Sequence, residues 1–190
     1  SITDDNDCPI GISVEITEFE PMSIEYESFD ISRFNFNNGI IDVTVSGGTG
    51  NYTYSWTADN GFTSSEEDIS NLSAGIYTLV VTDQNNCVND STVIEITEPD
   101  AIEINYTQSN YTDFGVSCYG ASDGFIDVTI TGGTGNYTYT WTADNGFTAS
   151  TDDISNLSAG NYSLSVVDEN DCLITLDVEI TEPDPIEIVF

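Results

Sequence analysis

The sequence contains one stretch of 17 residues twice, and this repeat constrains the fold more than any other feature. Residues 47–63 return as residues 132–148 at an offset of 85 positions, and the two copies differ only in Ser55 and Thr140. Close self-similarity at a fixed period is typical of tandem copies of one structural unit. In a chain of 190 residues, this offset predicts two full units.

Partial copies of the same unit flank the two full ones. Asp5–Cys8 resembles Glu169–Cys172 at an offset of 164 positions, and Pro185–Ile188 resembles Ala101–Ile104, with which the second unit opens. We therefore interpret the chain as a segment of a longer tandem array. The predicted domains are the C-terminal strand of a preceding repeat at 1–20, a first full repeat at 21–100, a second at 101–184 and the start of a following repeat at 185–190.

Alternation of apolar and polar residues predicts β-strands throughout both units. Ile41, Val43 and Val45 would share one face of a strand, for example, with Asp42 and Thr44 on the other face. Gly-rich and Asn-Gly turns separate the strands, and no segment shows a helical period. We therefore predict an all-β fold of tandem immunoglobulin-like antiparallel β-sandwiches.

Two pairs of aromatic residues favour the immunoglobulin-like form of the sandwich. Trp56 and Trp141 lie on the third main strand, where such domains bury a Trp. Tyr77 and Tyr162 stand at the start of a late strand, with the spacing of a tyrosine corner. We expect these four side chains to form the structural core.

The charge of the chain argues against several classes of function. Arg33 is the only basic residue against 34 acidic ones, which gives a formal charge of −33, so nucleic acids should be repelled. No apolar run is long enough for direct membrane insertion. Without histidine or lysine, the chain lacks the usual general base and nucleophile pairs, and we expect no enzyme. Paired carboxylates could serve a glycosidase, but the predicted sandwich forms no cleft for one.

The four cysteines are distributed unevenly between the repeats. Cys87 and Cys172 occupy equivalent positions, Cys8 is their counterpart in the leading partial copy, and Cys118 aligns with Arg33. Because Cys118 and Cys172 bracket the second repeat, we predict a disulfide between them, which would close about 55 residues and add about 4 kcal/mol in the chain-entropy model. Cys8 and Cys87 are predicted to be free thiols. A disulfide would indicate an oxidising, extracellular compartment.

Acidic turns precede the late cysteines, and acidic residues also follow each repeat. Asp and Asn alternate in these turns, so their oxygens could bind calcium, the only cofactor that the sequence suggests. A β-turn rich in Asp and Asn explains the same pattern, because the Gly and the closing Glu of an EF-hand loop are missing. The candidate calcium ligands are Asp83, Asn85, Glu98, Asp100, Asp168, Asn170, Glu182 and Asp184.

Several motifs in a fixed order resemble the SprB repeat family. The residues that carry the resemblance are Val116–Gly120, Asp123–Gly124, Gly132–Gly135, Tyr137–Trp141, Leu157–Tyr162, Asp168–Cys172 and Ile180–Pro183. This repeat is found in very large surface proteins of Bacteroidota, including a gliding-motility adhesin exported by the type IX secretion system. The resemblance implies a cell-surface stalk or adhesin without catalytic residues. The first unit departs from the family pattern at Arg33, where a Cys would be expected.

We therefore expect a stalk or repeat segment of a very large bacterial cell-surface adhesin that acts in gliding motility or surface attachment. The expected partners are neighbouring repeats of the same chain and an external surface or polysaccharide, without nucleic acid or direct membrane insertion. The alternative is a carbohydrate-binding module on a secreted surface protein. It would use Phe62 and Phe147, which follow Asn-Gly turns and are expected at loop tips.

Overall fold

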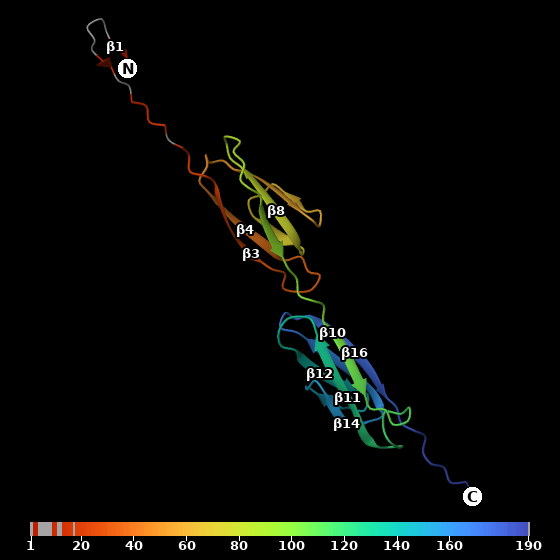
Figure 1. Cartoon of the computed structure of the whole chain (residues 1–190). Helices are drawn as coiled ribbons and strands as arrows, with labels where there is room; N and C mark the ends of the chain where they lie inside the picture. Colours follow the sequence, from red (N-terminus) through yellow and green to blue (C-terminus); the bar gives the residue numbers. More distant parts are fainter. Residues whose placement is uncertain (1, 4–8, 11–12, 17, 190) are drawn as a thin grey trace. The chain divides into compact units, whose positions relative to one another are not determined.

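The computed structural model describes residues 2–3, 9–10, 13–16 and 18–189 (Figure 1). The chain forms two compact units, and these described residues contain no helix. The first unit comprises residues 1–28, 40–69 and 75–95, and the second comprises residues 29–39, 70–74 and 96–190. Cys8 and its predicted free thiol lie outside the described residues, and the repeat boundaries proposed from the sequence stay predictions.

The strands before residue 100 form three antiparallel sheets. A two-stranded sheet pairs β1 with β2, a three-stranded sheet has the order β3-β4-β7, and a four-stranded sheet has the order β6-β5-β8-β9. The strand bounds are β1 (Ile2–Thr3), β2 (Pro9–Ile10), β3 (Ser23–Phe29), β4 (Gly39–Ser46), β5 (Thr53–Ala58), β6 (Thr63–Ser64), β7 (Ile69–Leu72), β8 (Gly75–Thr82) and β9 (Thr92–Ile96).

The strands after residue 100 repeat this arrangement. The three-stranded sheet has the order β10-β11-β14, and the four-stranded sheet has the order β13-β12-β15-β16. The strand bounds are β10 (Glu103–Gln108), β11 (Ser122–Thr131), β12 (Thr138–Ala143), β13 (Thr148–Ala149), β14 (Ile154–Ser158), β15 (Gly160–Val167) and β16 (Leu173–Ile180).

The core of each sandwich follows from the two-residue period of its strands. On β4, Ile41 and Val43 are buried while the alternate residues Ile40 and Asp42 are exposed, because successive side chains point to opposite faces of a sheet. In the second sandwich, both sheets contribute to one core cluster, which packs them face to face. Its fully buried members are Val116, Ile126, Trp141, Leu157, Tyr162, Leu164, Val166 and Ile180.

The details of the core confirm the immunoglobulin-like prediction. Trp56 on β5 and Trp141 on β12 are 1% and 0% exposed, and Tyr77 and Tyr162 are buried with them. The Tyr162 hydroxyl donates to the carbonyl of Ser158 at 2.9 Å, which is the contact of a tyrosine corner. Three strands opposite four, with the buried Trp on the third main strand, complete the pattern.

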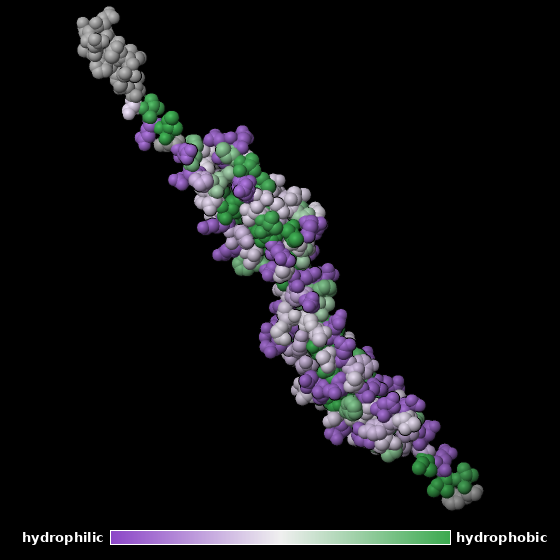
Figure 2. Space-filling model, in the orientation of Figure 1, coloured by the Kyte–Doolittle hydropathy of each residue, from purple (hydrophilic) through white to green (hydrophobic). Residues whose placement is uncertain are grey.

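Hydrophilic residues dominate the surface around these cores. Figure 2 shows hydrophobic residues in small groups between hydrophilic ones over much of the visible face. The segment that follows β16 is one exception, since Ile186, Ile188 and Val189 are all strongly exposed. Val14, Ile16 and Phe19 before β3 are exposed to a similar degree, and single exposed apolar residues elsewhere are usual on protein surfaces.

Candidate functional site

Asp168 follows β15 and organises the turn that leads into β16, here called the Asp168 turn (residues 168–172). Only 5% of this residue is exposed. Its Oδ2 accepts hydrogen bonds from the backbone N–H and the hydroxyl of Thr134 at 3.0 and 2.8 Å. Its Oδ1 accepts from the N–H groups of Asn170 and Cys172 at 2.9 and 2.8 Å. Four donors therefore fix the Asp168 turn against the Gly-rich turn at 132–135.

These donors also set the ionisation of Asp168. Burial by itself would raise the pKa of the carboxyl group, but the hydrogen bonds from Cys172, Thr134 and Asn170 outweigh burial and lower the pKa below its ordinary value. Each of these bonds is stronger when the acceptor carries a negative charge. Asp168 is therefore a structural carboxylate at neutral pH.

The first unit contains the same arrangement of hydrogen bonds around Asp83, in a turn here called the Asp83 turn (residues 83–87). The hydroxyl and the N–H group of Thr49 donate to Asp83 Oδ2 at 2.7 and 3.2 Å. The N–H groups of Asn85 and Cys87 donate to Oδ1 at 2.9 and 2.8 Å. The side-chain hydrogen bond from Thr49 is the largest cause of the lowered pKa of Asp83. This recurrence identifies the turn as a fixed part of the repeat.

The chain enters the second sandwich past the Asp168 turn. The N–H group of Gly133 donates to the carbonyl of Asp100 at 2.8 Å. Gly132 has a φ of 74°, and a Cβ atom there would lie 1.9 Å from the carbonyl oxygen of Ala101. Only glycine allows this approach in a left-handed conformation. The segment thereby forms one wall of a groove that is also lined by Arg33, Phe34, Asp168, Cys172, Leu173 and Ile174.

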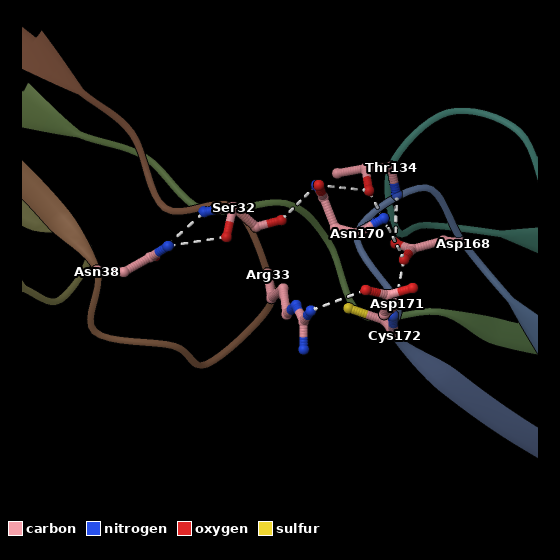
Figure 3. A network of polar contacts seen from close by, with 8 residues as sticks. All are labelled: Ser32, Arg33, Asn38, Thr134, Asp168, Asn170, Asp171 and Cys172. Carbon is pink, nitrogen blue, oxygen red and sulfur yellow. Dashed lines mark hydrogen bonds and ion pairs between the residues drawn. The ribbon is translucent and has the colours of Figure 1, made fainter.

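A loop of the second unit, residues 29–39, contacts the Asp168 turn, and we call it the first tip loop (Figure 3). The side-chain amide of Asn170 donates to the carbonyl of Ser32 at 2.7 Å and to the hydroxyl of Thr134 at 2.9 Å. The guanidinium group of Arg33 pairs with Asp171 at 3.5 Å. In Figure 3, the sulfur of Cys172 points toward Arg33.

The ion pair in this contact contributes little free energy by itself. The side chains of Arg33 and Asp171 are 35% and 85% exposed, and pairs of this kind contribute about 0–1 kcal/mol. The guanidinium group also lies over the ring of Phe36, with Cζ 5.4 Å from the ring centroid. The tip loop is therefore positioned mainly by hydrogen bonds, both from Asn170 and from its own N–H groups to Thr97 and Glu98.

The predicted calcium ligands do not converge in the structure. Within the described part of the chain, no three acidic, Cys or His side chains form a group that could hold a metal ion. Asp83 and Asp168 instead accept four hydrogen bonds each. Glu98 and Glu182 accept from the N–H groups of Asn35 and Gly120 at 2.6 and 2.7 Å. Asn170 acts as a donor, and Asn85 occupies the same place in the Asp83 turn. Asp100 and Asp184 line two different grooves.

The predicted disulfide between Cys118 and Cys172 is wrong. Both side chains are free thiols, as is Cys87. Cys172 lies just before the start of β16. Cys118 lies on a loop at the other end of this strand, because the N–H group of Gly120 in that loop donates to Glu182, just after the end of β16. A strand of eight residues separates the two positions by about 25 Å, far beyond the reach of a disulfide. The sequence showed that the cysteines bracket the repeat but not that they lie at opposite ends of one strand.

The aromatic residues of the carbohydrate alternative are not free platforms. Phe62 packs edge-on against Tyr77 with ring centroids 5.5 Å apart, and Phe147 packs in the same way against Tyr162 at 5.6 Å. Both Phe side chains are half-buried. A ring that already uses one face or edge for the core has less area to stack on a sugar.

A pair of carboxyl groups adds a second electrostatic feature to the second unit. The hydrogen bond between Asp127 and Asp153, followed by their like charge, raises the pKa of Asp127. Asp153 Oδ1 also accepts from the N–H group of Val128 at 2.8 Å, which holds it beside β11. The pair lies on the outer face of the three-stranded sheet. It belongs neither to the Asp168 turn nor to the first tip loop.

Sequence reasoning missed the tip loop and the two Thr residues. Thr49 and Thr134 stand inside the repeated Gly-Gly-Thr-Gly motif, so the repeat marked them without indicating their partners. The alignment of Arg33 with Cys118 was the available signal for the tip loop. Its meaning depended on knowing that position 33 lies against the Asp168 turn.

Among the described residues, no helix is long and apolar enough to cross a membrane.

A family model described as "SprB repeat" matches the chain at residues 30–61 and 115–146, which confirms the resemblance inferred from the sequence. Each match contains a Gly-rich turn and the strand with the buried Trp. A search among curated proteins finds no match.

A search of solved structures finds a molecule described as "Structure of amphioxus IgVJ-C2 molecule". It is 14% identical to this chain, the similarity covers 87% of this chain and 98% of the other, and the TM-score is 0.35. This similarity is too distant to add to the fold assignment above.

Proposed function

We propose that this chain, which carries two SprB repeats, is a stalk segment of a very large bacterial cell-surface adhesin that serves gliding motility or surface attachment. Its role is mechanical: it extends and presents the adhesin outside the cell. Its partners are neighbouring repeats and an external surface or polysaccharide, and it performs no catalysis. The type IX secretion route belongs to this proposal through the resemblance to the repeat family.

One observation carries the proposal, namely that the chain enters and leaves the second sandwich at opposite ends. It enters beside the Gly-rich turn, where Gly133 bonds to Asp100. It leaves after β16, where Glu182 bonds to the loop that carries Gly120. A unit of this kind lengthens a chain with each copy, as a stalk requires.

The arrangement of the terminal strands also suits a load-bearing unit. β10 and β16 both run from the entering end to the leaving end, and the side chain of Gln108 near the end of β10 donates to the carbonyl of Glu179 in β16 at 3.3 Å. A pull on the two ends therefore acts along the strands, so many interactions must yield together. The charge of −33 disfavours nonspecific association of separate chains with one another and with anionic surfaces.

Labelling of intact cells tests the proposed location. Antibodies raised against the purified chain should bind unpermeabilised cells of the source organism, with an antibody against a cytoplasmic protein as the control for leakage. Removal of the encoded segment should reduce adhesion or gliding speed. Labelling that requires lysis would contradict the proposal.

Force spectroscopy on the purified chain tests the mechanical role. We expect sawtooth unfolding events, each of which lengthens the chain by roughly 250 Å, since about 85 residues extend by about 3.3 Å each and the folded length is subtracted. Smooth extension without force peaks would contradict a load-bearing role. Glycan binding that is lost on Phe62→Ala or Phe147→Ala would instead favour the carbohydrate alternative.

A further inference from the structure

The second unit contains a second loop, residues 114–124, that is built like the first tip loop, and we call it the second tip loop. The two loops correspond at an offset of 85 positions. Four hydrogen bonds of the first tip loop have an equivalent in the second. Two are between backbone groups: Ile31 N to Thr97 O matches Val116 N to Thr181 O, and Phe36 N to Arg33 O matches Ala121 N to Cys118 O. Two use side chains: Ser32 N to Asn38 Oδ1 matches Ser117 N to Asp123 Oδ1, and Asn35 N to Glu98 Oε2 matches Gly120 N to Glu182 Oε2.

These shared bonds fix both loops in one conformation before any partner binds. Asn35 and Gly120 even share a left-handed backbone, with φ of 57° and 73°. A loop that is already ordered loses little conformational entropy on docking. The second tip loop is therefore prepared for the kind of contact that the first one makes.

The contact of the first tip loop shows what such a loop binds. Ser32 and Arg33 lie against Asn170 and Asp171 of the Asp168 turn, and the sulfur of Cys172 points toward Arg33. Asn85 and Cys87 stand at the same places in the Asp83 turn. Both described copies of the turn thus carry an Asn and a Cys at these places.

The second tip loop presents a different residue at the contacting position. Cys118 takes the place of Arg33, and both Cys118 and its neighbour Tyr119 are exposed. Both line a groove with Pro183, Asp184, Pro185 and Ile186, which matches the way Arg33 and Phe34 line a groove with Pro99–Ile102. The second tip loop thus repeats the build of the first, with a thiol at its centre.

We propose that the second tip loop is a docking surface for the Asp168-type turn of a further copy of this repeat, and that Cys118 forms a disulfide with the cysteine of that turn. The two thiols lose two protons and two electrons to a small-molecule disulfide, which is reduced to two thiols. Where the tip loop carries Arg, as at Arg33, an ion pair to Asp171 replaces this bond. The inference goes beyond the stalk proposal, because it concerns the purified chain and does not depend on where the cell displays it.

A single substitution brings the same pair of thiols together within this chain. Arg33→Cys places a thiol at the contacting position of the first tip loop, and Asn37→Cys in the same exposed loop is the matched control. After oxidation with a small-molecule disulfide, Arg33→Cys should lose two thiols, and peptide mapping should join position 33 to Cys172. The Asn37→Cys chain should keep its thiols. No cross-link, or equal cross-linking by both variants, would overturn the proposed docking geometry.

A lengthened chain tests Cys118 directly. Because Pro185–Ile188 corresponds to Ala101–Ile104, a second copy of residues 105–190 joined after Ile188 continues the repeat in register. Oxidation should link Cys118 to the late cysteine of the added copy, and a Cys118→Ser chain should lose no thiols. If Cys118 keeps its thiol in the lengthened chain, or pairs with Cys87 instead, the proposal is wrong.

Discussion

At the scale of single residues, Asp168 fixes the turn into β16 against the Gly-rich turn through four hydrogen bonds. Asp168→Ala leaves the N–H groups of Thr134, Asn170 and Cys172 without their acceptor, and it should lower the free energy of unfolding by about 2 kcal/mol. Asp168→Asn keeps one acceptor and should cost less. Urea unfolding followed by tryptophan fluorescence measures both changes.

The pH dependence of the same variants checks the role of the charge. Because the pKa of Asp168 is lowered in the folded state, its stabilising contribution is present above the unfolded pKa, near 3.8, and is lost as the pH falls through the folded value. The difference between parent and Asp168→Asn should therefore be largest at neutral pH and small at about pH 2. A difference that persists in acid would mean that packing rather than charge is responsible.

Asp127 should show the opposite dependence. Its pKa is raised in the folded state by Asp153, so its favourable contribution is present below the unfolded pKa and is lost as the pH rises through the raised folded value. Asp127→Asn should therefore stabilise the chain at neutral pH and lose this advantage in acid. Asp42→Asn is the matched control at the equivalent position of the first repeat. An equal gain from both variants would indicate a general charge effect.

At the scale of elements, the Gly-rich turn determines where the chain enters each sandwich. Gly132→Ala places a Cβ against the Ala101 carbonyl, and with backbone strain it should cost about 3 kcal/mol or more. Gly146→Ala is the control, because its φ of 86° is similar but nothing lies within 4 Å of the added atom. It should cost about 1 kcal/mol. Thermal unfolding of the two variants separates the clash from the strain, and equal losses would exclude the clash.

The stretch from Cys87 to Ile96 is one residue longer than the equivalent stretch from Cys172 to Ile180, which predicts an irregularity at the last strand of the first sandwich. β15 and β16 pair without interruption from Gly160 and Ile180 to Val167 and Leu173. After the bridge between Thr82 and Val88, in contrast, the chain leaves the ladder until β9 begins at Thr92.

The side chain of Asn89 bridges this interruption. Asn89 Oδ1 accepts from the N–H group of Val81, and the N–H group of Asn89 donates to the Val81 carbonyl. Asn89→Ala should cost about 1 kcal/mol and speed amide exchange at Val81 in particular. Unchanged exchange at Val81 would show that water replaces the side chain without loss.

At the scale of the whole molecule, this difference predicts that the two units differ in stability. The second has an unbroken β15–β16 ladder, and Trp141 Nε1 donates to the carbonyls of both Thr151 and Asp152. Trp56 donates only to Glu66 among the described contacts. In rising urea, hydrogen exchange should therefore reach β8 before β15. Simultaneous exchange of both strands would show that the chain unfolds as one cooperative unit.

The sequence by itself determined the fold class, the repeat and the core. Local patterns suffice for these features, because a two-residue period decides which side chains face inward and Gly-rich turns decide where strands reverse. Trp56, Trp141, Tyr77 and Tyr162 were found in this way. The family resemblance followed from the same local motifs.

Only the tertiary structure decided which distant groups meet. The sequence grouped Cys118 with Cys172 because both belong to one repeat, but β16 holds them at opposite ends of a sandwich. It grouped Asp168 with the calcium ligands, whereas the fold supplies four N–H and O–H donors that use up the same oxygens. Partners of this kind depend on how strands pair over long separations, and no local pattern encodes the identity of the neighbour that the fold brings into contact.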